Sequence, residues 1–167
     1  MISLRPCENT ERDAWQAFEW RNDPDTVASA YYPEPKTWDS FYMEYAECYF
    51  DDPYFPPQFV IYKRQYAGFV RYDAAQMPEY PDQKIVEVMI NIAPEFRGRG
   101  VGTRALALIK QEAAQKNVFG LMADIRKENA ASIRLFEKQG FFFLGERAEY
   151  LQRLQKNCHI LRCFYAL

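Results

Sequence analysis

The stretch EFRGRGVGTRALALIK, residues 95–110, lies between a β-branched run and an amphipathic helical pattern. Every second residue at its centre is a glycine: Gly98, Gly100 and Gly102. Such a backbone can turn its N–H groups toward one point in front of a helix N-terminus, which makes a cradle for an anion such as a pyrophosphate. Arg97 and Arg99 add positive charge beside this cradle, and Thr103 can add a hydroxyl. The stretch therefore predicts an anion-binding loop that connects a strand to a helix.

Two well-known phosphate-binding loops fit this stretch poorly. A Walker loop ends in Gly-Lys-Ser/Thr, whereas the order here is Gly102-Thr103-Arg104. A dinucleotide loop follows the first strand of its domain, whereas three earlier strands are expected here, although Asp124 lies near the distance at which such a loop needs an acidic residue. A glycine-rich turn that binds nothing is a further alternative for this stretch taken alone.

Alternation of apolar residues and the positions of turn residues predict the elements around the loop. Strands are expected at residues 1–6, 58–62, 66–72, 84–92, 121–125, 141–144 and 160–167. Helices are expected at residues 13–20, 38–50 and 129–139, and from the glycine loop to about residue 116. Asn9 or Thr10 can cap the first helix, and residues 26–40 should form a loop with short helical pieces. The predicted fold class is α/β (α+β), with a mixed sheet of about six to seven strands flanked by about four helices.

The composition is that of one globular domain, residues 1–167. Of the 167 residues, 49% are hydrophobic and 26% are charged, so the chain can fold around one core and is not disordered throughout. The formal net charge of −2 gives no indication of nucleic-acid binding. Because the chain shows neither an apolar run of about 18 residues nor an export signal, we expect no membrane span and a cytoplasmic location.

The chain has few of the side chains that metal sites and catalytic triads require. The four cysteines, Cys7, Cys48, Cys158 and Cys163, show no CxxC spacing, and reduced thiols are expected. His159 is the only histidine, so we expect neither a zinc site nor a Ser-His-Asp triad. The sequence therefore predicts an activity without a bound metal.

A second motif follows the glycine loop. It consists of Asn129, Ser132, Leu135-Phe136, Glu137-Lys138 and Gly140-Phe141. Together with Arg97-Gly98-Arg99-Gly100-Val101-Gly102, it makes the run from Val86 to Phe143 resemble the acyl-CoA-binding core of the GNAT acetyltransferase superfamily. The resemblance is close over roughly the last half of the chain and extends to the first half only in the order of elements.

The resemblance implies an N-acetyltransferase that uses acetyl-CoA as its acyl donor and needs no metal. It assigns the acceptor side to about residues 1–80 and the acyl-CoA-binding core to about residues 84–143. The residues that it implies for donor binding are Ile90, Asn91, Ile92, Arg97, Gly98, Arg99, Gly100, Val101, Gly102, Thr103, Asn129, Ser132 and Phe136.

Each part of this set has an implied role. Backbone groups of residues 90–92 should bond the pantetheine arm as an added strand would, and the amides of residues 98–103 should hold the pyrophosphate. Asn129 should reach the pantetheine or acetyl end, and Phe136 should lie beside the thioester. Family members also use backbone groups at the splay between two central strands to polarise the acetyl carbonyl.

Phe136 departs from the family pattern, because many members carry a tyrosine there that protonates the leaving thiolate. Phenylalanine has no hydroxyl, so either another group acts or the thiolate leaves unassisted, which a thiol pKa of about 8.5 permits near neutral pH. Tyrosines of the first half, Tyr150 and Tyr165 are alternatives for this role. The departure also motivates a second hypothesis, a non-catalytic acyl-CoA-binding module.

Glu87 is the candidate general base, because it lies on the strand that leads into the loop, where some family members place a glutamate. An amine attacks a thioester only when it is neutral, so a proton must leave the ammonium. A salt-bridged or exposed strand residue is the alternative for Glu87. Asp124 is a weaker candidate, and His159 is expected to have a surface role.

The first half of the chain is expected to hold the acceptor. It carries an aromatic series, Tyr31, Tyr32, Trp38, Phe41, Tyr42, Tyr45, Tyr49, Tyr54 and Phe55, most of which should belong to the core. The rest can wall a cleft in which one or more of these acidic residues hold a positive charge: Glu34, Asp39, Glu44 and Glu47. The segment Trp20-Arg21-Asn22-Asp23-Pro24 is similar to family branches that acetylate amino sugars, and more broadly to aminoglycoside-modifying members.

The leading hypothesis is therefore an enzyme that moves acetyl from acetyl-CoA to a primary amine of a small molecule, of the amino-sugar or aminoglycoside type, by direct attack. Acetylation of a protein or peptide amine, a non-catalytic module and a purely structural domain are the alternatives. Terminal strands and aromatic loops often form dimer contacts in this family, so a homodimer is an open expectation.

Overall fold

The computed structural model describes residues 1–167, whose centre is a sheet of seven strands. The strands are β1 (Ile2–Pro6), β2 (Gln58–Tyr62), β3 (Gln65–Ala75), β4 (Ile85–Ile92), β5 (Gly120–Arg126), β6 (Phe142–Leu151) and β7 (Lys156–Ala166). They lie in the order β1-β2-β3-β4-β5-β7-β6, and only the β4–β5 pair is parallel.

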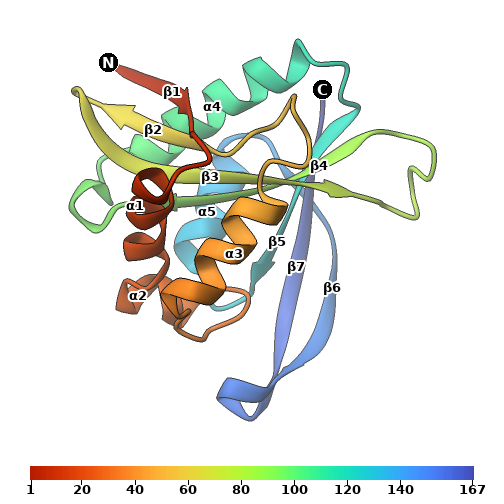
Figure 1. The fold of residues 1–167 in the computed structure, drawn as a ribbon. Helices are drawn as coiled ribbons and strands as arrows, with labels where there is room; N and C mark the ends of the chain where they lie inside the picture. Colours follow the sequence, from red (N-terminus) through yellow and green to blue (C-terminus); the bar gives the residue numbers. More distant parts are fainter.

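Helices cover both faces of the sheet (Figure 1). On one face lie α1 (Glu11–Arg21), α2 (Pro24–Ser29) and α3 (Trp38–Cys48), and on the other lie α4 (Val101–Ala114) and α5 (Ala130–Lys138). Thr10 caps α1, since its side chain accepts a hydrogen bond from the Asp13 amide. None of these helices is long and apolar enough to cross a membrane. The predicted fold class is confirmed, with five α-helices where about four were expected.

The two central strands separate soon after they meet. Residues Ile85–Glu87 of β4 pair with Gly120–Met122 of β5, and beyond them the two strands share no pairing. β4 continues along β3 to Ile92, while β5 continues along β7 to Arg126. In Figure 1, β3 and β4 cross the molecule while β5, β6 and β7 run steeply downward, so a wedge opens between the two groups.

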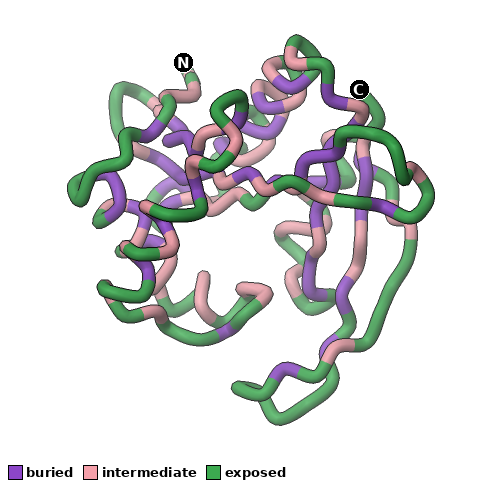
Figure 2. Tube along the Cα trace, turned by 45° about the vertical axis from the view of Figure 1, so that its right-hand side comes forward, coloured by how far each residue is buried: buried purple, intermediate pink, exposed green.

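The aromatic series of the first half is divided between core and surface. The core holds Phe41, Tyr45, Tyr49 and Phe55, and Trp38 and Tyr42 pack against it, so six of the nine belong to the core as expected. In contrast, Tyr32 and Tyr54 are exposed. Buried positions concentrate in the sheet and in α4, whereas β6, the outer strand of the β6–β7 hairpin, is mostly exposed (Figure 2).

The hairpin is the main difference from the predicted elements. The sequence predicts strands at 141–144 and 160–167, but β6 and β7 extend to Leu151 and back to Lys156. Most of β6 is exposed on both faces, so its side chains carry no alternation of apolar and polar residues that could reveal a strand. His159 consequently lies inside β7 and not before it, where its Nδ1 is 2.7 Å from a Glu146 oxygen.

Candidate active site

The glycine loop presents a group of unused hydrogen-bond donors. Gly98 and Gly100 adopt φ values of +71° and +73°, a backbone conformation that side chains disfavour, and Gly100 is the N-cap of α4. The backbone amides of residues 98–103 donate no hydrogen bond within the protein. A Cβ added at either glycine would meet no atom within 4 Å, so the space in front of these amides is open. Open donors at a helix N-terminus fit an anionic group such as the pyrophosphate of coenzyme A.

Arg97 and Arg99, which flank Gly98, point to different surroundings. Arg99 is exposed, and its guanidinium lies 5.9 Å from the centre of the Phe96 ring. Arg97 is half-buried and donates from Nε to the Ile92 carbonyl at 2.9 Å. The remaining contacts of Arg97 are with α2 and its cap, on the opposite side from α4.

The backbone at the end of β4 is open toward the wedge. Past Glu87, β4 has no strand partner on the side of β5, which leaves backbone groups in the region of residues 90–92 for an extended ligand. The side-chain oxygen of Asn91 is within hydrogen-bond reach of the Thr26 hydroxyl, at 3.3 Å. The carbonyl of Ile92 is already bonded by Arg97.

The second motif has a clear structural basis. Asn129 caps α5, and its Oδ1 accepts a hydrogen bond from the Ser132 amide at 3.2 Å. The backbone amide of Asn129 donates to the Arg126 carbonyl at 2.9 Å, whereas its side-chain nitrogen Nδ2 donates to no protein group and is available to a ligand. Phe136 is only 2% exposed and packs edge-to-face on Phe141, with ring centroids 4.9 Å apart. Packing in the core is enough to explain a phenylalanine at position 136. That Phe136 lies beside a thioester stays a prediction.

Glu87 is the one carboxylate of this region without a cation partner. It is half-buried on β4, opposite Asp73 of β3, at the position where β4 and β5 separate. It makes no ion pair and no hydrogen bond. Burial, together with the charges of Asp124 and Asp73, raises the pKa of Glu87 to about 7, although Arg162 and Arg71 oppose the shift. A carboxyl group with this pKa can accept a proton near neutral pH.

Asp124, the weaker candidate, is fully compensated. Arg162 donates to its two oxygens at 2.9 and 3.0 Å, and Arg147 donates to it at 3.0 Å. Burial alone would raise the pKa of Asp124, but these two arginines outweigh it and hold the pKa below its usual value. Asp124 is therefore a poor base, and its fixed charge acts on Glu87 instead.

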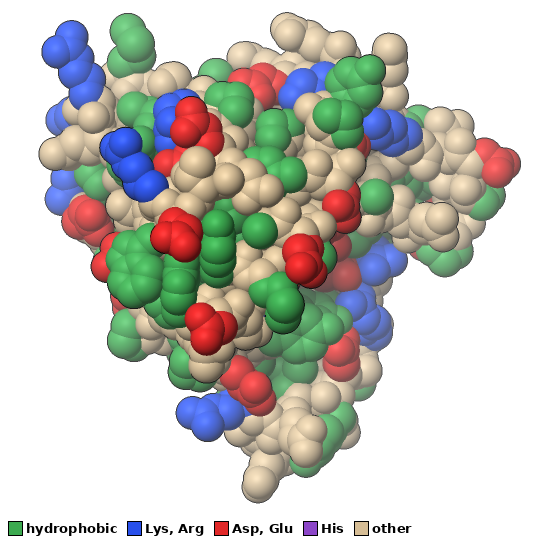
Figure 3. Space-filling view, viewed as in Figure 1, with side chains coloured by type: hydrophobic (Ala, Val, Ile, Leu, Met, Phe, Trp, Pro, Cys, Tyr) green, Lys and Arg blue, Asp and Glu red, His purple; other side chains and the backbone are tan.

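The acidic residues that the sequence suggested for the acceptor also differ in whether they have a cation partner. Glu44 of α3 forms ion pairs with Lys36 and with Arg71, the latter at 2.9 Å. By contrast, Glu34, Asp39 and Glu47 are exposed and form no ion pair. In the space-filling view, acidic and basic side chains gather between α3 and the hairpin (Figure 3).

Sequence reasoning missed the side chains that complete this surface. They are Arg71, Asp73, Arg147, Glu149 and Arg162, which join Tyr31 of the aromatic series. Asp73 and Arg162 become visible only from strand register, because they are the cross-strand partners of Glu87 and Asp124. Arg147 and Glu149 lie on the part of β6 that was not predicted as a strand.

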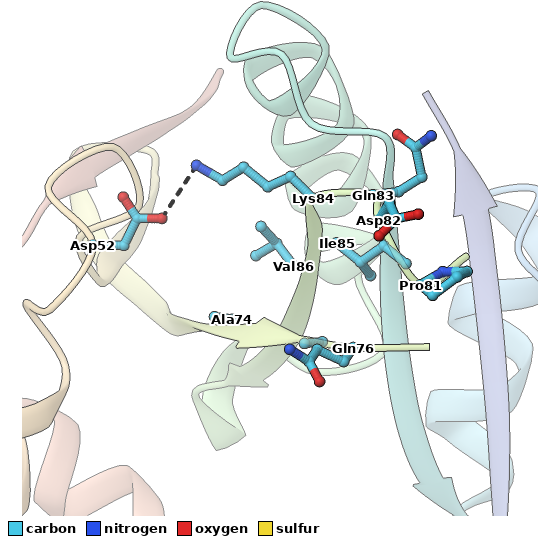
Figure 4. Close-up of a pocket in the computed structure, with 10 residues that line it drawn as sticks. Asp52, Ala74, Gln76, Pro81, Asp82, Gln83, Lys84, Ile85 and Val86 are labelled. Carbon is cyan, nitrogen blue, oxygen red and sulfur yellow. Dashed lines mark ion pairs between the residues drawn. The ribbon is translucent and has the colours of Figure 1, made fainter. Parts of the chain in front are cut away.

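A separate hollow lies at the start of β4, at the opposite end of that strand from the glycine loop. It is lined by residues of β3, β4 and the loop between them, and Lys84 reaches across it to Asp52 (Figure 4). The ion pair between the two measures 3.5 Å. Because the hollow lies at the other end of β4 from the glycine loop, we do not assign it to the reaction.

Comparison with known proteins identifies the family. The family model for an acetyltransferase (GNAT) domain matches residues 2–142. The chain belongs to the GNAT acetyltransferase family. It is therefore an N-acetyltransferase, with acetyl-CoA as its acyl donor.

Solved structures of GNAT enzymes share the whole fold. A proposed phosphinothricin N-acetyltransferase is 25% identical, with a TM-score of 0.81 over 100% of this chain and 99% of that chain. A ribosomal-protein-alanine N-acetyltransferase from Brucella melitensis is 25% identical, with a TM-score of 0.79 over 99% of both chains. A spermidine N-acetyltransferase from Vibrio cholerae, solved with CoA and spermine, is 20% identical, with a TM-score of 0.80 over 99% and 95%. No curated protein is significantly similar in sequence.

Proposed function

We propose that this GNAT enzyme transfers acetyl to a primary amine of a small molecule by direct attack, with Glu87 as the general base. The observation that carries the proposal is the environment of Glu87. Its carboxyl group lies where β4 and β5 separate, lacks a cation partner and has a pKa of about 7. An ammonium group placed there would meet a carboxylate that no cation of the protein compensates and that can take its proton.

The chain supplies the other parts of the reaction from separate elements. The free amides of residues 98–103 would hold the pyrophosphate, and the open backbone near residues 90–92 would hold the pantetheine arm. The Asn129 side-chain amide would add a donor toward the same arm. When bound, acetyl-CoA supplies the thioester carbonyl that the amine attacks. Glu87 removes the ammonium proton, directly or through water, and no side chain is needed for the thiolate.

The charge distribution supports an acceptor with a single ammonium group at the reacting end. Every other carboxylate around Glu87 is already compensated: Asp124 by Arg147 and Arg162, and Asp73 and Glu44 by Arg71. A polycation would need several free carboxylates in place of these pairs. An amino sugar with one amine therefore fits better than an aminoglycoside.

A small acceptor also fits the segment between α2 and α3. We call residues 30–37 the strap. Arg126 donates to the Ala28 and Ala30 carbonyls and Tyr31 bonds Glu149 on β6, so the strap is fastened across this face of the sheet. A peptide acceptor would need an open groove along the same path. The strap therefore favours the small molecule over a protein substrate.

The test is thiol release from acetyl-CoA in the presence of amines of different classes. The amines are amino sugars with and without a linked nucleotide, aminoglycosides, spermidine, and peptides with a free N-terminus. We expect turnover with an amino sugar, and we expect Glu87→Gln to abolish most of it. Glu79→Gln, which removes an exposed carboxylate without an ion pair or an assigned role, is the matched control and should keep full activity. Thiol release only with peptides, or with no amine although coenzyme A binds, would contradict the proposal.

A further inference from the structure

The segment Arg21-Asn22-Asp23, which the catalytic machinery does not use, ties several parts of the molecule together. Arg21 donates from Nη2 to the Tyr32 carbonyl at 2.7 Å. Asn22 bonds Lys36 twice, because its amide nitrogen donates to the Lys36 carbonyl at 2.6 Å and its oxygen accepts from the Lys36 amide at 2.8 Å. Both residues therefore fix the strap relative to the end of α1.

Asp23, the next residue, connects α2 to the donor loop. It is the N-cap of α2, and its Oδ2 accepts from the Thr26 amide at 3.1 Å. The same oxygen lies 3.1 Å from Nη1 of Arg97. Partial burial alone would raise the pKa of Asp23, but the Thr26 amide and Arg97 outweigh it and keep the pKa below its usual value. Asp23 is therefore ionised at neutral pH and paired with the residue that precedes the free amides.

All three side-chain nitrogens of Arg97 take part in contacts with α2, its cap or β4. Nη2 donates to the Thr26 hydroxyl at 2.8 Å, Nη1 pairs with Asp23, and Nε donates to the carbonyl of Ile92, the last residue of β4. The Asp23 side chain is 19% exposed and the Arg97 side chain 32% exposed. A partly buried pair with several charge-assisted hydrogen bonds is stronger than an exposed pair.

We propose that Arg97 and Asp23 are positioning residues that couple the donor loop to the acceptor side of the enzyme. Arg97 directly precedes Gly98, so a donor that orders the loop also orders the Arg97 backbone. Through Asp23 and Thr26, Arg97 then holds α2, and α2 leads directly into the strap. The role that the glycine stretch suggested for Arg97, positive charge beside the pyrophosphate, is the competing interpretation.

The first experiment measures amide hydrogen exchange over residues 24–37, with and without coenzyme A. Asp23→Ser is the central variant, because serine keeps the helix cap but removes the charge. Arg97→Gln removes the other partner. Asp25→Asn is the matched control, since the Asp25 carboxylate is 92% exposed and lies 3.7 Å from Arg97. We expect exchange about tenfold faster in Asp23→Ser and Arg97→Gln, no change in Asp25→Asn, and protection by coenzyme A only where the pair is intact.

The second experiment measures the Kd of coenzyme A for the same proteins. Positioning predicts that Asp23→Ser and Arg97→Gln change this Kd by less than about threefold, because neither removes a free amide. If Arg97→Gln instead weakens coenzyme A by about tenfold or more while strap exchange stays unchanged, the pair is not a coupling device and Arg97 is a donor ligand.

The inference depends on the proposed function in one respect only, namely that the strap lies on the side of the enzyme that binds the acceptor. Neither experiment needs an acceptor, so failure to find a substrate would not affect its outcome. Once an acceptor is known, a third measurement separates positioning from donor binding. We expect Asp23→Ser to raise the KM for the amine more than the KM for acetyl-CoA, and an equal rise of both would contradict the proposal.

Discussion

At the residue scale, Glu87 combines burial with two carboxylate neighbours, and its pKa of about 7 makes the pH dependence of the reaction testable. Only the ionised form can accept a proton, so kcat/KM should rise with pH and level off above about pH 7. Glu87→Gln should lower kcat/KM by about 10²- to 10³-fold and remove this limb of the profile. A pH profile that keeps the same limb in Glu87→Gln would show that another group titrates.

Gly100 tests the donor loop in a comparable way. Its φ of +73° and the open space in front of it mean that Gly100→Glu places a carboxylate directly before the free amides. We expect the affinity for coenzyme A, measured by calorimetry, to fall at least about tenfold. Backbone strain at this φ should also lower the free energy of unfolding by about 1–2 kcal/mol. Gly145→Glu is the control, because Gly145 is also open but lies on β6. Equal affinity in the two variants would place the pyrophosphate elsewhere.

At the scale of elements, the strands and helices next to the glycine loop could be predicted closely. The expected strand 84–92 is β4 at Ile85–Ile92, and the expected helix 129–139 is α5 at Ala130–Lys138. Both carry strong local signals, a β-branched apolar run in one and an asparagine cap with a terminal glycine in the other. The resemblance to the GNAT family, which rests on these same stretches, made Glu87 and Asn129 candidates for the site.

The partners of these residues could not be predicted, because they depend on strand register and on contacts between distant segments. Glu87 meets Asp73 only through the pairing of β3 with β4. Arg97 meets Thr26 across 71 residues of chain. The glycine motif suggested an anion for Arg97, whereas its tertiary neighbours are Asp23 and Thr26.

The start of β5 gives an element-scale prediction about how the wedge is built. Gly120 pairs with Ile85 where β4 and β5 meet, and a Cβ there would lie 2.3 Å from the ring of Phe164. Gly120→Ala should therefore displace Phe164 and lower the free energy of unfolding by about 1–3 kcal/mol. Denaturant unfolding measures this loss, and Gly145→Ala should show none. An unchanged stability would mean that the ring moves away without cost.

At the scale of the whole molecule, the surface that we propose for the acceptor is assembled from the two ends of the chain. The strap comes from the first forty residues, whereas Arg147, Glu149 and Arg162 come from the hairpin. The family model matches residues 2–142 and ends where β6 begins. The residues proposed for donor binding therefore lie within the stretch that the family model matches, whereas Arg147, Glu149 and Arg162 lie beyond it. This division explains why the donor could be inferred from motifs and the acceptor could not.

Tyr31 joins these two ends and provides the last prediction. Its hydroxyl donates to Glu149 and accepts from Arg147 at 2.9 Å, and Arg147 in turn bonds Asp124 at 3.0 Å beside Glu87. Tyr31→Phe removes both hydrogen bonds of the hydroxyl. The free energy needed to open the strap should fall by about 1 kcal/mol, so that proteolytic cleavage of the strap becomes about fivefold faster.

The neighbouring residue supplies the control for Tyr31. Tyr32 is 66% exposed and its hydroxyl makes no hydrogen bond, so Tyr32→Phe should leave the cleavage rate unchanged. Coenzyme A should bind both variants like the parent enzyme, because the strap does not contact the free amides of the loop. If Tyr31→Phe and Tyr32→Phe are cleaved at the same rate, the strap is held by Arg126, Arg21 and Asn22 alone, and the hairpin does not close the acceptor side.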